Sequence, residues 1–215
     1  MDKQTELKIT IADLAASRYL TNPRFTIQSI ADELNLSPEE IFELFPNRSS
    51  ILRYYYESRF IVYRNQTESI DNYSDFTLSE KLSNLFLNIL DQFSENREFV
   101  LKTYPAGFCA NNFKGSFDDD LKQEIREIFR SDSRISGTAG FLKKPLLYSA
   151  LVKHFDGFVL FWKNDESSMN QQTMALIDKW SSFVQELFYS KIGDQAFDLG
   201  KFLLYVSPLK KFINR

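Results

Sequence analysis

The sequence predicts an all-α protein in which an N-terminal head of three helices, a helix-turn-helix, is followed by a larger helical body. Three observations predict this fold class. Apolar residues recur at helical spacing along most of the 215 residues, and no stretch alternates convincingly with a period of two. Glycine and proline are scarce, at seven and six residues, so little of the chain is given to turns. Hydrophobic residues make up 43% of the chain, which is enough for a sizeable core.

The first two helices of the head are predicted by apolar spacing and by residues that end helices. Apolar side chains repeat from Leu7 to Tyr19, and Pro23 ends this helix because proline disfavours a helical residue before it. A second helix is expected at 26–34, with Thr26 as its N-cap. Asn35 follows it, and asparagine suits the left-handed backbone conformation found at helix ends.

The third helix, expected at 38–45, has the strongest start signal in the chain. Ser37 is suited to cap it, Pro38 fits its first position, and Glu40 stands three residues after the cap, as in a capping box. Pro46 closes it. The second and third helices are joined by a tight turn and preceded by a supporting helix. In a helix-turn-helix of this kind, the last helix enters the major groove of DNA.

The body is expected to consist of longer helices. A fourth helix at 49–63 and a polar connector at 65–76 lead into it. Thr77 and Glu80 form a second capping box, after which apolar residues repeat at helical spacing. Further helices are expected at 97–110, 117–130, 145–163, 167–189 and 194–206, with a loop at 131–140. We therefore place the head at 1–50 and the helical body at 51–215; the resemblance described below implies that this body binds a ligand and forms the dimer.

Three features of the composition exclude or disfavour certain classes of protein: the cysteine content, the lengths of the apolar runs and the net charge. Cys109 is the only cysteine, so no internal disulfide is possible. No apolar run approaches the roughly 20 residues of a membrane span, and residues 1–8 are charged, unlike a signal peptide. We therefore expect a cytoplasmic protein with no membrane span. The net charge of −3 argues mildly against a broadly basic nucleic-acid coat, although DNA binding depends on where the charges lie.

Residues with catalytic or metal-binding chemistry are few. His154 is the only histidine, and the sequence offers it no partners for a metal site or a Ser-His-Asp triad. The aspartates at 118–120 lack the alternation of a calcium loop and are expected in the first turn of a solvated helix. Without a glycine-rich phosphate loop or a nucleophile elbow, we expect no enzyme, no cofactor and no metal.

The head carries a specific resemblance to a known family. Residues 25–52 read FTIQSIADELNLSPEEIFELFPNRSSIL. This segment resembles the N-terminal signature of the TetR family of bacterial regulators, and its spacing matches without gaps. The resemblance is specific over about residues 6–60 and extends elsewhere to the general architecture. The matching residues are Thr26, Ile30, Ala31, Ser37, Phe45 and Arg48.

The resemblance implies a one-component switch. In that family two long helices near the end of the chain, here 145–163 and 167–189, pair across a two-fold axis to form a homodimer, and the body holds a small-molecule pocket. The dimer binds a palindromic operator in double-stranded DNA, with its heads about one helical turn, roughly 34–36 Å, apart. A ligand that favours another spacing releases the DNA by shifting the population of conformations.

The residues implied to face DNA include two glutamates. The family usually has glycine and then threonine or serine where this chain has Glu39 and Glu40, and tyrosine where it has Phe42. Glu39 and Glu43 are candidates to accept hydrogen bonds from cytosine in the major groove, whereas helix capping is the simpler role for Glu39 and Glu40. Arg48 is the expected phosphate contact. The predicted DNA-facing set is Thr26, Ser37, Pro38, Glu39, Phe42, Glu43 and Arg48.

The charge of the head leaves two hypotheses open. Residues 1–58 carry six Lys or Arg and nine Asp or Glu, a net charge of −3. Affinity for DNA is largely built from phosphate neutralisation, so this sign is unfavourable. One hypothesis is a ligand-responsive regulator that binds its operator as a homodimer. The other is a protein that keeps the fold, has lost DNA binding and acts as a carrier of a lipid-like ligand or as a partner-binding module.

The aromatic content predicts an apolar effector in the body. Phenylalanine supplies 21 residues, and such large flat side chains fill cores but also line pockets for apolar ligands. Core packing is the alternative role for each ring, and a satisfied, partly buried histidine is the alternative for His154. The candidate ligand-binding residues are Phe86, Phe93, Phe99, Tyr104, Phe108, Phe129, Tyr148, His154, Phe158 and Trp162.

Overall fold

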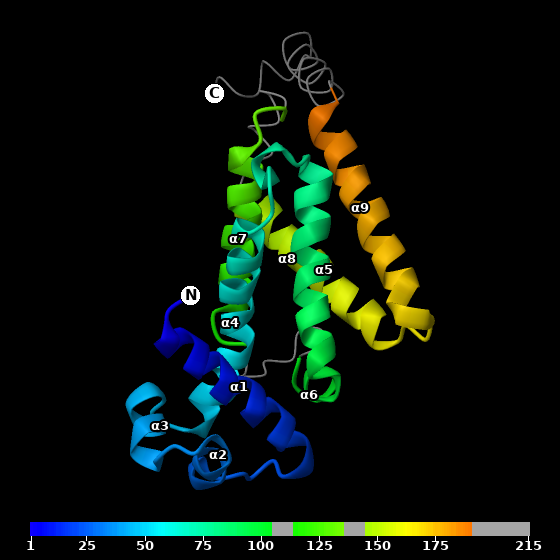
Figure 1. Cartoon of the computed structure of the whole chain (residues 1–215). Coiled ribbons are helices and arrows are strands. Elements are labelled where there is room, and N and C mark those ends of the chain that lie inside the picture. Colours follow the sequence, from blue (N-terminus) through cyan, green and yellow to red (C-terminus); the bar gives the residue numbers. More distant parts are fainter. Residues whose placement is uncertain (105–113, 136–144, 191–215) are drawn as a thin grey trace, which may run out of the picture.

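The computed structural model describes residues 1–104, 114–135 and 145–190, apart from the side chains of residues 145 and 146. All regular structure in these ranges is helical, which confirms the predicted fold class. The head lies at one end of the molecule, and the longer helices of the body extend away from it (Figure 1). The elements are α1 Lys3–Thr21, α2 Ile27–Leu34, α3 Pro38–Leu44, α4 Arg48–Glu68, the 3₁₀ turn η1 Tyr73–Asp75, α5 Leu78–Glu95, α6 Arg97–Thr103, α7 Phe117–Ser131, α8 Pro145–Lys163, the 3₁₀ turn η3 Ser168–Asn170 and α9 Gln171–Tyr189.

Both predicted capping boxes are present, and they fix the starts of α3 and α5. The Glu40 N–H donates to Ser37 Oγ at 3.3 Å, and the Ser37 N–H donates to Glu40 Oε2 at 2.7 Å. The Glu80 N–H likewise donates to Thr77 Oγ1 at 3.3 Å, and the Thr77 N–H to Glu80 Oε2 at 2.6 Å. Each box satisfies two backbone N–H donors that a bare helix end would leave open.

The predicted connector at 65–76 is partly wrong, because α4 continues into it and η1 occupies three of its last residues. Polar side chains of the last turns of α4 are held by the body. Arg64 pairs with Glu124 of α7, and Gln66 Oε1 accepts a hydrogen bond from Asn88 Nδ2 of α5. These tertiary contacts extend the helix beyond the point at which its apolar periodicity stops.

Other expected elements differ at their ends or reach the limits of the described ranges. The helix expected at 97–110 is seen as α6, and residues 105–113 lie outside the described residues. The helix at 194–206 and the end of the loop at 131–140 also lie outside them. The long helix expected from residue 167 begins only at Gln171, because Met169 and Asn170 adopt positive φ values of 52° and 54° within η3.

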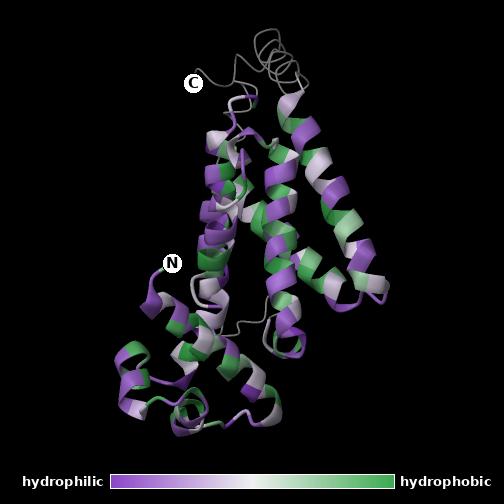
Figure 2. Cartoon of the chain, viewed as in Figure 1, coloured by the Kyte–Doolittle hydropathy of each residue, from purple (hydrophilic) through white to green (hydrophobic). Residues whose placement is uncertain are grey.

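In the body, α5 packs against α4, α7 and α9, and α8 crosses to contact α7 and α9 (Figure 1). Figure 2 shows hydrophobic residues concentrated on the sides of these helices that face one another. No helix in the described ranges is both long and apolar enough to span a bilayer. The stripe predicted on α5 is confirmed as core, since its members are at most 4% exposed: Leu82, Leu85, Phe86, Ile89, Leu90 and Phe93.

The head is joined to the body through α1, α4 and α6. Arg59 of α4 is buried, and its Nη2 donates to Asp13 Oδ1 of α1 at 2.7 Å. Its Nε donates to the Tyr55 carbonyl at 2.9 Å, and the guanidinium lies 4.4 Å from the centroid of the Tyr55 ring. Tyr19 of α1 meets Phe99 of α6 edge to face at 5.6 Å. Burial raises the pKa of Asp13, and the Arg59 charge opposes this shift.

Candidate functional site

The turn between α2 and α3 sets the arrangement of the helix pair. Asn35 adopts the left-handed conformation with φ 54°, and its N–H donates to the Ala31 carbonyl. The Leu36 N–H reaches the same carbonyl at 2.9 Å. Ala31 of α2 and Ile41 of α3 are fully buried, so the two helices pack through their inner sides. The outer side of α3 is left open to a partner.

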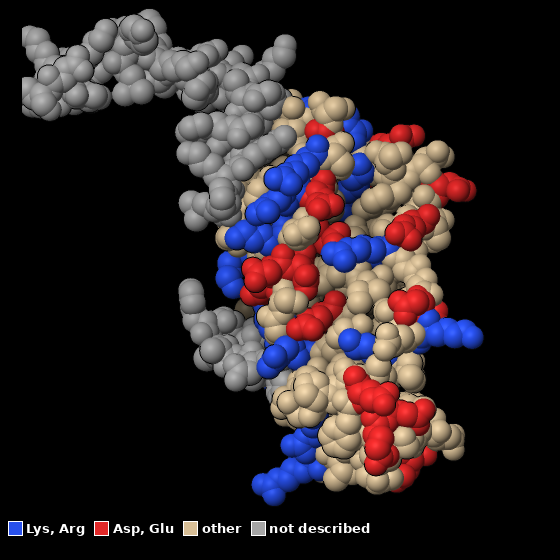
Figure 3. All heavy atoms as spheres, turned by 90° about the vertical axis from the view of Figure 1, so that its left-hand side faces the viewer, with Lys and Arg blue, Asp and Glu red and all other residues tan. Residues whose placement is uncertain are grey.

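This outer face of α3 presents two carboxylates beside an apolar ring. Glu39, Phe42 and Glu43 are exposed, and Phe42 is 53% exposed. Their spacing of three and four residues places them on one side of the helix. In Figure 3, carboxylates gather at the lower end of the molecule, where the head lies. The surface that would enter a DNA groove is therefore acidic around an exposed phenylalanine.

Three of the predicted DNA-facing residues build the starts of the helix pair. Thr26 Oγ1 accepts from the Ser29 N–H at 3.1 Å, and Ser37 caps α3. Pro38 occupies the first position of α3 and is half-buried. The Ser37 N–H lowers the pKa of Glu40, which stabilises the charged form of this carboxylate. A hydroxyl that accepts at a cap keeps its own hydrogen, so Thr26 and Ser37 remain capable of donating to a phosphate.

Arg48 opens α4 and is tied to the loop that follows α1. Its Nη1 donates to the Phe25 carbonyl at 2.9 Å, and the guanidinium lies 5.4 Å from the centroid of the Phe25 ring. Phe25 is itself buried. A guanidinium has five N–H donors, so this bond leaves donors for a phosphate. The predicted phosphate contact therefore also holds the head together.

Two other cations of the head are engaged within it. Arg18 pairs with Glu33, and its Nε donates to Glu33 Oε2 at 2.8 Å. Lys8 Nζ lies 4.3 Å from the centroid of the Tyr54 ring and 5.3 Å from that of Phe45. The positive charge available to a phosphate backbone is correspondingly reduced. The head also has exposed cations at Lys3, Arg24 and Arg53.

Most of the predicted ligand-binding rings of the body are packed among other rings. The centroid of Phe86 lies 5.5 Å from that of Phe155 and 5.6 Å from that of Phe158, and Phe129 lies 4.9 Å from Phe188. This packing favours the core alternative, and the ligand-binding role stays a prediction. Phe108 lies outside the described residues. The buried members are Phe86, Phe93, Phe99, Tyr104, Phe129, Tyr148, Phe158 and Trp162.

Two members of the set differ from the others. His154 is exposed on α8, where its ring centroid lies 5.3 Å from that of Trp180 and its Nδ1 lies 2.9 Å from the Ala150 carbonyl. It is not among the buried rings. The guanidinium of Arg97 lies 4.2 Å from the centroid of the Trp162 ring. Trp162 also lines a groove of about 350 Å³ between α5 and the start of α9.

The last two described helices, α8 and α9, each carry large apolar residues that are exposed. On α9 the predicted apolar side divides in two: Ile177 and Val184 are buried, whereas Phe183 is 65% exposed. Leucines on α9 and an adjacent pair on α8 are also exposed. We call the following set the α8–α9 apolar face: Leu160, Phe161, Leu176, Phe183 and Leu187.

Buried charged residues were not predicted from the sequence. Lys81 is only 4% exposed, because it stands three residues after Leu78 and four before Leu85 on the buried side of α5. The spacing of Lys81 from Leu78 and Leu85 is the sequence signal that could have predicted its burial.

On α8, Asp156 Oδ1 accepts a hydrogen bond from the Tyr104 hydroxyl at 2.7 Å. Burial, with a smaller effect of Asp156, holds the pKa of Tyr104 well above its usual value.

Comparisons with known proteins bear on the body. A family model described as tetracyclin repressor-like, C-terminal domain, matches residues 81–203, which is more than half of the chain. The match begins in the first turn of α5 and extends past the end of α9. Comparison with curated proteins gives no match.

Proposed function

This chain belongs to the tetracycline repressor-like family, and from that membership we propose that it is a ligand-responsive transcription regulator that binds a palindromic DNA operator as a homodimer. The observation that carries the proposal is the head, in which α2 and α3 form a helix-turn-helix around the left-handed Asn35. The outer face of α3 is exposed beside its supporting helix, as a DNA-reading helix requires.

The α8–α9 apolar face supports the proposed homodimer. Exposed apolar patches of this kind mark interaction surfaces on soluble proteins. Pairing through helices 145–163 and 167–189 of two copies buries the ring of Phe183, which a single copy leaves 65% exposed. A two-fold dimer also presents two heads, which matches the two half-sites of a palindromic operator.

In the head, cations and glutamates have separate proposed roles. Arg48, at the start of α4, contacts a phosphate with the donors that Phe25 does not use. Glu39 and Glu43, on the outer face of α3, accept hydrogen bonds from the amino group of cytosine. Phe42 lies between them and contacts an apolar edge of a base, such as the thymine methyl group.

Selection from a random duplex pool tests this function. The purified protein is incubated with the pool at low salt, bound DNA is sequenced, and the affinity for the selected site is followed against salt. We expect a palindrome with half-sites about one helical turn apart and a steep loss of affinity with salt. Failure to enrich any sequence at low salt contradicts the proposal.

The variant Glu43→Gln distinguishes two roles of this carboxylate, recognition of a base and repulsion of the DNA backbone. If Glu43 reads a base, the variant selects a different base at one position of each half-site. If the carboxylate only repels the backbone, the variant binds the same sequence more tightly. Glu68→Gln, an exposed glutamate in the last turn of α4, is the matched control and should change neither result.

A second candidate function is favoured by the acidic face of α3. In this alternative the protein has lost DNA binding and carries a lipid-like ligand or binds a protein partner. Extraction of the purified protein with organic solvent, followed by mass spectrometry, tests the carrier form. A stoichiometric hydrophobic molecule together with no DNA enrichment favours the alternative, and enrichment of an operator rejects it.

A further inference from the structure

A cavity of about 370 Å³ lies between the end of α4, the 3₁₀ turn η1, the start of α5 and α7. Volumes of this size are typical of small-molecule sites. The lining combines two phenols, three hydroxyl side chains, one lysine and two glutamates with one apolar side chain. The lining residues are Tyr63, Thr67, Tyr73, Ser74, Lys81, Glu124, Glu127, Ile128 and Ser131.

Lys81 is the unusual member of this lining. It is 4% exposed, and its Nζ donates to the Ser74 carbonyl at 3.0 Å. Among the residues that the structure describes, no carboxylate lies within 4.0 Å of this ammonium. An ammonium has three donors, so two remain without a hydrogen-bond acceptor in the part of the chain that the structure describes. A buried charge that lacks a counter-ion is costly, and an anion in the cavity would offset that cost.

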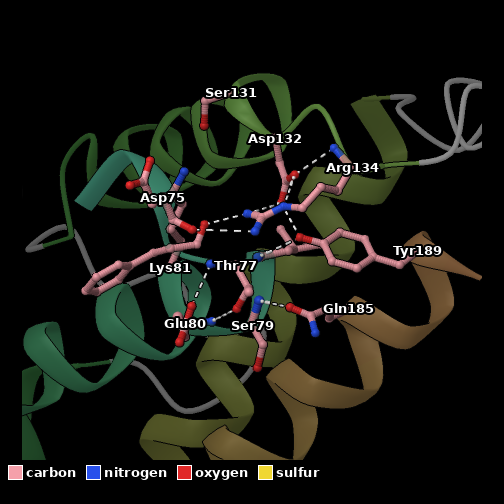
Figure 4. A network of polar contacts seen from close by, with 12 residues as sticks. Asp75, Thr77, Ser79, Glu80, Lys81, Ser131, Asp132, Arg134, Gln185 and Tyr189 are labelled. Atoms are coloured by element: carbon pink, nitrogen blue, oxygen red, sulfur yellow. Dashed lines mark hydrogen bonds and ion pairs between the residues drawn. The ribbon is translucent and has the colours of Figure 1, made fainter. Parts of the chain in front are cut away.

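Arg134, a cation that follows the end of α7, is already neutralised. Its Nε donates to Asp132 Oδ1 at 3.0 Å, and Asp132 also accepts from the Tyr189 hydroxyl (Figure 4). The same guanidinium donates to the Phe76 carbonyl at 2.6 Å. Lys81 lies beside this network and is not part of its charge compensation (Figure 4). The uncompensated positive charge at the cavity is therefore that of Lys81.

The two glutamates of the lining do not supply that compensation. Glu124 is paired with Arg64, and burial raises the pKa of Glu124. Glu127 is exposed and accepts from Gln123 Nε2 at 3.2 Å. Neither carboxylate is within ion-pair distance of Lys81.

The phenols of the lining add a neutral donor. The hydroxyls of Tyr63 and Tyr73 are 2.7 Å apart, so one donates to the other. The accepting hydroxyl then keeps its own hydrogen, which is available to a further acceptor. Lys81 Nζ lies 5.9 Å from the centroid of the Tyr73 ring, so the ammonium and the phenol pair border the same space.

We propose that this cavity binds a small carboxylate with an apolar or aromatic body, whose carboxylate pairs with Lys81 and accepts a hydrogen bond from the Tyr63–Tyr73 pair. Charge-assisted hydrogen bonds of this kind are about twice as strong as neutral ones. The apolar part of the ligand lies against Ile128 and the ring of Tyr73. The proposal that a carboxylate binds here depends only on the cavity and its lining residues. The further idea that this ligand is the effector rests on the proposed regulatory function.

Calorimetric titration at pH 7 and constant ionic strength tests the proposal with three matched probe pairs: benzoate and benzamide, 1-naphthoate and 1-naphthamide, and octanoate and octanamide. Each pair shares its body and differs in charge. We expect at least one carboxylate to bind the wild-type protein about tenfold or more tightly than its amide, which corresponds to a charged hydrogen bond. The absence of this preference in all three pairs overturns the proposal.

Variants locate the preference. Lys81→Met keeps the aliphatic stem and removes the charge, so it should abolish the preference, whereas Lys81→Arg should retain part of it. Lys102→Met, at an exposed lysine of α6, is the matched control and should bind like the wild type. Circular dichroism checks that each variant is folded. A carboxylate preference that survives in Lys81→Met overturns the site.

The calorimetric titration and the DNA selection give independent answers. A carboxylate preference that depends on Lys81, found in a protein that selects no DNA, keeps the site and rejects the regulatory function. Operator selection without any carboxylate preference keeps that function and rejects the site.

Discussion

The head and the body each expose a phenylalanine, and the two have opposite surroundings. Phe42 on α3 is 53% exposed between Glu39 and Glu43, whereas Phe183 on α9 is 65% exposed among leucines of the α8–α9 apolar face. The same side chain is thus displayed once within a polar surface and once within an apolar one. Neighbouring residues, more than the ring itself, determine which partner each surface suits: a polar, hydrogen-bonding one for the head and an apolar one for the body.

The largest expected effect separates these two phenylalanines. Phe183→Glu places a charge at the centre of the proposed homodimer interface, and we expect it to raise the dimer dissociation constant by about 100-fold or more, as loss of a central aromatic contact does. Sedimentation velocity over a dilution series measures this constant. Phe42→Glu is the matched control and should leave the dimer unchanged. Equal effects of the two variants, or a monomeric wild type, contradict the proposed interface.

A smaller effect is expected at the joint between head and body. Arg59→Met removes a buried guanidinium and leaves the partly buried Asp13 without its partner, so the free energy of unfolding should fall by about 2–3 kcal/mol. Urea denaturation measures the loss. The control is Arg18→Met, which removes the exposed pair with Glu33 inside the head and should cost less than about 1 kcal/mol.

A double variant strengthens the test of the joint. Asp13→Ala combined with Arg59→Met also removes the uncompensated carboxylate, so it should recover part of the stability lost in Arg59→Met. If Arg59→Met costs no more than Arg18→Met, the buried pair does not stabilise the joint.

The smallest expected effect concerns the two predicted capping boxes, at the starts of α3 in the head and α5 in the body. Hydrogen bonds from the N-cap residue lower the pKa of Glu80, as they do for Glu40. A lowered folded-state pKa stabilises the protein above the unfolded value of about 4.3 and loses that contribution as the pH falls through the folded value. Glu80→Gln and Glu40→Gln keep an acceptor for the backbone N–H but do not titrate.

The stability difference between the wild type and each of these capping variants should therefore shrink as the pH falls from 6 to 3. Thermal unfolding at a series of pH values measures it, with Glu68→Gln as the control at an exposed position that caps no helix. A difference that stays constant with pH in both boxes contradicts the assignment.

The elements with local signals were predictable from the sequence. Ser37 with Glu40, and Thr77 with Glu80, mark helix starts through bonds that span only three residues. Asn35 marks a helix end in the same way. The tertiary features were less accessible, because they depend on partners distant in sequence. The last turn of α4 is extended partly by the contact of Gln66 with Asn88, which is 22 residues away.

The candidate sites show the same division. The outer face of α3 follows from its own periodicity, so Glu39 and Glu43 were predicted and are exposed. Lys81, which borders the cavity, is not predicted by the sequence. Whether a buried lysine lacks a counter-ion depends on which carboxylates lie near it in space, and the sequence does not give their positions. Similarly, the sequence predicts that Phe183 and Val184 share a helix, but only the packing of α9 on α5 shows which of them is covered.

One consequence of α4 is mechanical. It is a single unbroken helix that begins in the head at Arg48, and in its last turns carries Tyr63 and Thr67 on the wall of the cavity. The joint at Arg59 lies between the two ends, and α4 pivots about it. The arm from Arg59 to Arg48 is about 17 Å long at about 1.5 Å per residue, so a tilt of about 5° moves the head end through about 1.4 Å. The arm from Arg59 to Tyr63 is only about 6 Å long, so a displacement at the cavity becomes a larger one at the head.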